Sequence, residues 1–175
     1  EVDSQARFPA EAIAALGERG FFGLCLPAEF GGQGHPPRVF AAVAEELAMA
    51  CASTAMIYVM HVSASQTFAS STTLSNRETL LQQVCAGKHL TTLAFSERGS
   101  RSQFWAPVSE LREKTPQNGC TTNAYKSWVT SANHADSYVS SAQRPRAESP
   151  LESTLYLARR GADGMRIVSS FDGLG

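Results

Sequence analysis

The strongest constraint on the fold of this chain is a change of residue pattern near Gly87. Residues 1–90 hold 16 of the 25 alanines, and their apolar residues recur at helical spacing, whereas apolar and polar residues alternate further along. Ala is the strongest helix former, and alternation is typical of half-buried strands. The sequence therefore predicts an α+β protein, with an N-terminal α-helical bundle at residues 1–88 and a β-sheet, barrel-like domain at residues 89–175.

Four helices are expected before Gly87. Pro9 suits the first turn of the first helix, Ser53 and Thr54 are candidates to cap the third, and Asn76 is the candidate cap of the fourth. The third segment is apolar nearly all round, so it should lie at the centre of the bundle. The expected helices cover residues 10–16, 38–50, 55–68 and 77–86.

Short strands are expected after Gly87. Asn118 and Gly119 form a strong hairpin signal, with a further strand after them, and residues 143–153 read as an exposed loop. Since the chain closes on apolar and glycine residues without a capping element, we expect it to be a piece of a longer protein. The other expected strands cover residues 90–95, 106–114, 126–131, 137–142, 154–158 and 165–169.

The composition excludes several classes of protein. The formal net charge is −1, so no basic surface for nucleic acid or an anionic membrane is expected. No run of about 18 apolar residues is present, so no membrane span is expected. The four cysteines form no CxxC pair, so no metal site is predicted, and the polar N-terminus, which does not read as a targeting segment, favours a cytoplasmic location.

The first segment with chemical potential is LAFSERGSRS, at residues 93–102. It follows a predicted strand and combines hydroxyl groups, a glycine and two arginines. Such a loop can present backbone N–H groups and guanidinium groups to a phosphate or pyrophosphate. Short Ser, Gly and Arg runs are also common in ordinary polar turns, so composition alone leaves that interpretation open.

The second segment is KSWVTSANHAD, at residues 126–136. Residues two apart in a strand share a face, so Trp128 and Thr130 should project together and Val129 should point the other way. A large flat ring beside a hydroxyl suits a planar heterocycle. A Trp on the packed face of the sheet is the alternative interpretation.

These two motifs follow LPAEFGGQG, at residues 26–34, in an order and at a spacing that resemble the acyl-CoA dehydrogenase family. The resemblance covers essentially the whole chain. It implies an α-helical N-terminal domain, a β-sheet middle domain and, beyond this chain, a C-terminal helical bundle.

The resemblance implies FAD as the cofactor. Segment 93–102 would wrap the pyrophosphate and the flavin edge, and Thr130 would lie beside the reactive N5 atom of the flavin. Val129 would contribute through its backbone, and Ser102 would reach the FAD phosphates. The residues expected to bind FAD are Leu93, Phe95, Ser96, Arg101, Ser102, Trp128, Val129 and Thr130.

Arg101 departs from the family pattern, which often has glycine at that position. We hypothesise that it pairs with a phosphate of FAD, because a guanidinium group suits phosphate. For the substrate, the resemblance implies that Met56 and Val59 line the acyl pocket and that Ser102 lies near the CoA moiety. Simple core packing is the alternative for the two helical residues.

The implied reaction is α,β-dehydrogenation of an acyl-CoA or acyl-carrier-protein thioester, as in fatty acid metabolism. A carboxylate removes the α-proton, and a hydride passes from the β-carbon to N5 of FAD. The family draws this base from its C-terminal domain, so no catalytic residue is assigned here, and Glu97 is interpreted as structural. The family further implies a homotetramer or homodimer and an electron-transfer flavoprotein or similar acceptor.

Two alternatives stay open. The same fold serves flavin-dependent monooxygenases and oxidases, which lack the C-terminal base. A non-catalytic fragment that does not bind FAD is the other alternative, and Arg101 is the residue that keeps it open.

Overall fold

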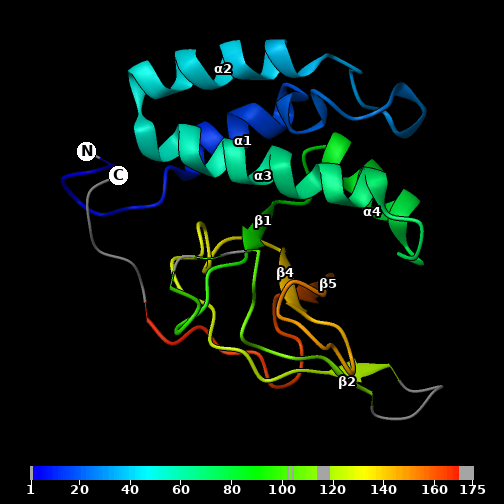
Figure 1. Ribbon diagram of the computed structural model, residues 1–175. Coiled ribbons are helices and arrows are strands. Elements are labelled where there is room, and N and C mark those ends of the chain that lie inside the picture. The colour runs from blue at the N-terminus through cyan, green and yellow to red at the C-terminus, as the bar shows by residue number, and fades with distance from the viewer. Residues whose placement is uncertain (1, 102, 104, 114–118, 170–175) are drawn as a thin grey trace.

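The computed structural model describes residues 2–101, 103, 105–113 and 119–169. Helices fill one half of the molecule and strands the other (Figure 1). The helices are α1 (Ala10–Glu18), α2 (Pro37–Ala50), α3 (Ala52–Ser70) and α4 (Arg77–Cys85), with short 3-10 turns η1 (Phe21–Gly23) and η2 (Ala28–Phe30). The strands are β1 (Thr91–Ala94), β2 (Arg112–Glu113), β3 (Cys120–Thr121), β4 (Ser137–Gln143) and β5 (Ser153–Arg159).

All four expected helices are present, and their ends lie within one turn of the predicted ones. The capping role predicted for Ser53 and Thr54 is wrong, because α3 already begins at Ala52. Cys51 holds the N-cap position with an extended backbone and no side-chain capping bond. Thr54 is buried inside the first turn instead, where it packs rather than caps. Asn76 does hold the N-cap position of α4, but it also makes no side-chain capping bond.

Helix α3 is the central helix, as its uniform apolarity predicted. It packs against α2 on one side and against β1 on the other (Figure 1). Its Tyr58 and Phe68 are almost fully buried, and the Tyr58 hydroxyl donates a hydrogen bond of 3.1 Å to the carbonyl oxygen of Phe21. The main core therefore lies on the two faces of α3, with no polar atom of Tyr58 left unsatisfied.

Gly87 ends the helical half because the space around it admits no side chain. Its φ is +69°, and a Cβ at this position would lie 2.5 Å from the carbonyl oxygen of Gly17. Both facts require glycine, since other residues rarely adopt a left-handed conformation and no atom tolerates that approach. The contact brings the end of α4 against α1 and directs the chain into β1.

The strands form one three-stranded sheet in the order β1-β4-β5 and a separate pair, β2-β3. Strand β1 runs parallel to β4, with Leu93 opposite Val139, whereas β4 and β5 are antiparallel. The predicted α+β class is confirmed. The barrel-like closure is not, because no closed barrel forms among residues 89–101, 103, 105–113 and 119–169.

Three predicted strands are wrong in whole or in part. Within the described residues 106–113, only Arg112–Glu113 forms a strand, and Glu110 makes an isolated parallel bridge to Gln143. The backbone N–H groups of Val108 and Ser109 bond to a carboxylate instead of to a neighbouring strand. Residues 165–169 form no strand: Met165 packs against the small core cluster around Ala94, but Ile167 and Val168 are exposed. The hairpin turn was expected at Asn118 and Gly119, and β2 and β3 do pair on either side of it, although Asn118 lies outside the described residues.

The third incorrect strand, 126–131, retains only an isolated bridge at Lys126. Trp128 and Ser131 have φ values of 56° and 60°. A left-handed residue breaks the extended geometry that a strand needs, so two of them convert the segment into a turn. The expectation that Trp128 and Thr130 share a strand face therefore loses its basis.

A buried polar network joins the helical half to the sheet. The backbone N–H of Thr91, the first residue of β1, donates to Nδ1 of His61 on α3 at 3.1 Å. The Ser137 hydroxyl donates a hydrogen bond to Oγ1 of Thr91 at 2.9 Å. It therefore accepts a hydrogen bond from Nε2 of His89, at 2.8 Å. These hydrogen bonds therefore connect α3 and the segment before β1 to the first residues of β1 and β4.

Among the residues that the structure describes, no helix combines the length and the apolarity needed to cross a membrane.

Candidate cofactor-binding site

The structure brings the two chemically promising segments side by side. The backbone N–H of Ser127 donates to the carbonyl oxygen of Ser96 at 2.9 Å, and that of Arg98 donates to Tyr125 at 3.2 Å. Glu97 and Lys126 form an antiparallel bridge between these two bonds. Both segments then continue as loops on the same side of β1 (Figure 1, green and yellow). The two segments predicted to bind the cofactor, about 30 residues apart in sequence, thus meet at Ser96 and Ser127.

A buried ion pair lies at this meeting point. Oε1 of Glu97 is 2.7 Å from Nζ of Lys126, and their side chains are 2% and 12% exposed. Oε2 of Glu97 accepts hydrogen bonds from the backbone N–H groups of Val108, at 2.6 Å, and Ser109, at 2.9 Å. The Ser109 hydroxyl also donates to Oε1. Burial alone would raise the pKa of the Glu97 carboxyl, but Lys126 and Ser109 hold it below its ordinary value, so the pair is ionised.

The loop after Glu97 is tightly turned. Gly99 and Arg101 have φ values of 101° and 51°, and the buried Ser100 hydroxyl donates to the carbonyl oxygen of Glu97 at 3.0 Å. Arg101 is exposed. Ser102, predicted to bind both the FAD phosphates and substrate, lies outside the described residues.

Residues 128–130 lead into a second turn. The Trp128 side chain is 79% exposed, whereas Val129 packs against the small core cluster around Ala94 and Tyr138. Thr130 is half-buried and precedes Ser131, whose carbonyl oxygen accepts bonds from His134 and Ala135. In this part of the site, the Trp128 ring is therefore exposed on a turn that packs against the core through Val129.

The side chains of Leu93 and Phe95 do not face a ligand surface. Both are half-buried and pack against the main core, which leaves their backbone as the part able to meet a cofactor. Ser96, the next residue, uses its carbonyl oxygen to hold Ser127. The contact role of these three residues stays a prediction.

The helix residues predicted to line the acyl pocket lie on α3. Met56 is 48% exposed and Val59 is half-buried, whereas their neighbour Ala55 belongs to the core. Met56 is thus accessible to a ligand or a covering domain, and Val59 partly so.

Sequence reasoning missed two contacts that support the site. Lys126 is the first residue of the second motif, and the alternating pattern around it does not indicate that it is buried with Glu97. Phe8 stacks on His134, with ring centroids 3.8 Å apart and planes 9° apart, so the N-terminal segment braces the turn after Thr130. No local signal predicts this contact, because the two residues lie far apart along the chain.

Two hollows are open on the surface, with volumes of about 290 and 250 Å³. One lies at the start of α4, and the other lies between α1 and the beginning of β1, beside Phe8, His89 and Asp136. Neither is lined by a residue predicted to bind FAD.

A helical layer, a mixed sheet and two joined loops at the end of its first strand define the α+β architecture of the chain. Residues 1–88 match the family model described as the acyl-CoA dehydrogenase N-terminal domain. The chain belongs to the acyl-CoA dehydrogenase family, whose members are flavoproteins.

Individual relatives agree with this assignment. A probable acyl-CoA dehydrogenase of Mycobacterium leprae is 30% identical over 138 residues, which are 79% of this chain and 35% of that protein. A 3-(aryl)acrylate reductase of Clostridium sporogenes is 25% identical over 177 residues, which are 100% of this chain and 46% of that protein. The butyryl-CoA dehydrogenase of Megasphaera elsdenii has the same fold, with a TM-score of 0.81 at 21% identity over 93% of this chain and 43% of that one.

The chain thus spans between a third and a half of the length of the relatives that it matches.

Proposed function

We propose that the protein containing this chain is an FAD-dependent acyl-thioester dehydrogenase. It would remove hydrogen from the α- and β-carbons of an acyl-CoA or an acyl-carrier-protein thioester. Family membership supports the reaction class. The observation that carries the proposal for this chain is the hydrogen bond between Ser127 and Ser96, because it joins the two segments that resemble the family's flavin-binding motifs.

The residues present fit the cofactor. Trp128 exposes a large flat ring, and Arg101 offers a guanidinium group on the loop joined to it. Such groups suit a heterocyclic ring system and a phosphate, respectively. When bound, FAD supplies the hydride acceptor. The residues proposed to hold it are Leu93, Phe95, Ser96, Arg101, Ser102, Trp128, Val129 and Thr130.

The base that removes the α-proton is proposed to come from a domain beyond this chain. Glu97 is unsuited to that role, because its side chain is 2% exposed and both of its oxygens already accept hydrogen bonds from the protein. Met56 and Val59 are proposed to contact the acyl chain. The partners proposed are an electron-transfer flavoprotein or a similar acceptor and further copies of this chain, as a homotetramer or homodimer.

Anaerobic titration of the full-length protein tests the proposal. A panel of acyl-CoA and acyl-carrier-protein thioesters is added while the visible flavin absorption band is recorded. Bleaching by one thioester supports the dehydrogenase and identifies its substrate class. A flavin that no thioester bleaches, but that oxygen reoxidises during turnover of another substrate, points to a monooxygenase or oxidase. A full-length protein that takes up no FAD contradicts the proposal.

The direction of the reaction needs its own measurement, since a relative named above is a reductase. The full-length protein is mixed with the saturated thioester and an oxidised dye, or with the enoyl thioester and a reduced dye. Faster turnover of the saturated thioester supports the dehydrogenase. Turnover of the enoyl thioester alone would assign the opposite direction.

A further inference from the structure

We infer that Glu97 and Lys126 are positioning residues, whose buried ion pair fixes the two proposed flavin-binding segments relative to each other. The inference rests on the proposed function and deepens it. Neither residue is proposed to touch FAD or substrate. Each acts through its neighbours: Ser96 precedes Glu97, and Trp128 follows Lys126 by two residues.

The first argument is that one side chain closes the loop that carries Arg101. Glu97 stands at the start of this loop, and its carboxylate accepts the backbone N–H groups of Val108 and Ser109 at the far end. Hydrogen bonds to a charged acceptor are stronger than neutral ones. The two ends of the loop are therefore held at one point, which restrains Arg101 between them.

The second argument is that the pair ties this loop to two further elements. Nζ of Lys126 lies 2.7 Å from Oε1 of Glu97 and donates to the carbonyl oxygen of Ser141, in β4, at 2.6 Å. The ammonium group thus connects the first loop, the second loop and the central strand of the sheet. A displacement of either residue would move both loops.

The third argument concerns where the pair lies. Glu97 and Lys126 form an isolated antiparallel bridge, so the two chains leave it in opposite directions. Each chain then reaches a left-handed residue, Arg101 on one side and Trp128 on the other. No strand pairing among the described residues restrains the chain between this point and those two residues. The ion pair, together with the packing of Val129 on the core, therefore sets their relative position.

Burial explains why loss of one partner has a large effect. A buried pair with every charge satisfied is tolerated, but removal of one partner leaves the other charge buried and unpaired. The segment then opens toward water to solvate that charge. In this chain, opening would separate the hydrogen bonds that join Ser96 to Ser127 and Arg98 to Tyr125.

The test compares the full-length protein with its Glu97→Gln and Lys126→Met variants. Arg144→Met and Glu152→Gln are the matched controls, because that ion pair joins the ends of β4 and β5 rather than the two loops, and is partly exposed. Three quantities are measured well below the thermal midpoint: the Kd for FAD, the visible spectrum of bound flavin, and amide hydrogen exchange at Val108, Ser109 and Ser127.

Each variant of the Glu97 pair is expected to raise the Kd for FAD by about tenfold or more, to change the flavin spectrum and to accelerate exchange at the three amides. The controls should change none of these. Ser109→Ala is a milder variant, which keeps the ion pair but removes one donor to Glu97, and it should raise the Kd by about threefold. It keeps the inference testable where a charge-removing variant fails to fold.

Unchanged Kd and spectrum in folded variants would overturn the positioning role. A wild-type protein that takes up no FAD would contradict the proposed function instead. In that case amide exchange alone tests the inference. Faster exchange in the Glu97 and Lys126 variants, but not in the controls, would support the link between the two segments. Equal exchange rates in all variants would overturn it.

Discussion

The imidazole of His61 accepts a hydrogen bond from the backbone N–H of Thr91 at 3.1 Å, and so connects the central helix α3 to the first residue of β1. His61 is fully buried, and its ring contacts that of Phe22 at a centroid distance of 4.1 Å. Because Nδ1 is the acceptor, the ring must be neutral. Protonation would place a charge in the core and break the bond at the start of the strand that leads to the proposed site.

This contact predicts a dependence of stability on pH. Burial lowers the pKa of His61 from 6.5 to about 3. The folded-state pKa lies below that of the unfolded chain, so the unfolded chain binds the proton first as the pH falls. The contribution of His61 to stability is therefore fully present at a pH above the pKa of the unfolded chain. As the pH falls from that pKa toward the pKa of the folded protein, this contribution is lost by up to about 1.4 kcal/mol per pH unit.

Urea unfolding of the wild type and His61→Gln at about pH 7, 6 and 5 measures this loss. Gln can still accept the bond from Thr91 but does not titrate. Burial also lowers the pKa of His89, which is present in both proteins, so the difference between them reports on His61 and its interaction with His89. The wild type should lose stability more steeply with acid than the variant. Parallel pH profiles would show that His61 is not the group responsible.

Gly87→Ala should destabilise the protein by about 2–4 kcal/mol, because it combines left-handed strain with a steric clash. The new Cβ would lie 2.5 Å from the carbonyl oxygen of Gly17. Gly161→Ala is the matched control: its φ of +77° is similar, but no atom lies within 4 Å of a Cβ there, so strain alone should cost about 1 kcal/mol. The denaturant midpoints of the two variants, at unchanged m-values, measure both losses of stability. If the two variants lost the same stability, the contact between Gly87 and Gly17 would be unimportant.

The helices could be predicted from the sequence because their signals are local. Apolar spacing and terminal Pro and Gly residues lie within each segment, and α1, α2 and α4 fall where those signals predict them. Strands depend on partners elsewhere in the chain. Residues 106–114 have the alternation of a strand, but their N–H groups at 108 and 109 bond to Glu97, an acceptor that no periodic pattern could reveal.

The candidate site was predictable in its parts but not in its assembly. The motifs at 93–102 and 126–136 stand out by residue type, whereas their contact depends on parallel pairing of β1 with β4 and on the bridge at Lys126. Such pairings join residues far apart in sequence. The left-handed backbone of Trp128 was also hidden, because Trp is a common strand residue and gives no turn signal.

Arg101→Gly should separate the backbone role of this residue from its charge. Glycine adopts φ near 51° without strain, so stability should hold or rise slightly. If the guanidinium pairs with a phosphate of FAD, the Kd for FAD should rise by about tenfold and lose part of its dependence on salt. Calorimetric titration of the full-length apoprotein with FAD measures this. Arg146→Gly is the control.

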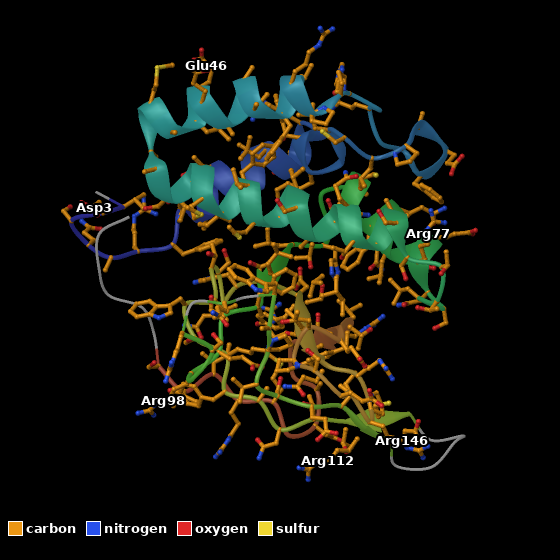
Figure 2. All side chains as sticks on the ribbon, viewed as in Figure 1. Asp3, Glu46, Arg77, Arg98, Arg112 and Arg146 are labelled. Carbon is orange, nitrogen blue, oxygen red and sulfur yellow. The ribbon has the colours of Figure 1, made fainter. Side chains whose placement is uncertain are left out.

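The control is well matched because Arg146 also has a left-handed backbone, with φ of 59°. Its side chain lies at the opposite end of the sheet half from Arg98, a neighbour of Arg101 in the first loop (Figure 2). Arg146→Gly should leave the Kd for FAD unchanged. An Arg101→Gly protein that binds FAD as tightly as the wild type would refute phosphate pairing, and leave this arginine directed to solvent.

Trp128→Ala should reduce FAD binding while changing the free energy of unfolding by less than about 0.5 kcal/mol, because a ring that is 79% exposed adds little to the core. Its neighbour Val129, which packs against the cluster around Ala94, provides the converse variant. Val129→Ala should lower stability by about 1 kcal/mol yet keep the Kd for FAD, since its proposed contact is through the backbone. Urea unfolding and FAD titration of both variants measure this opposite pattern. If Trp128→Ala instead lost stability and kept its affinity, the ring would be a packing residue, and the flavin surface proposed on these loops would lose its aromatic component.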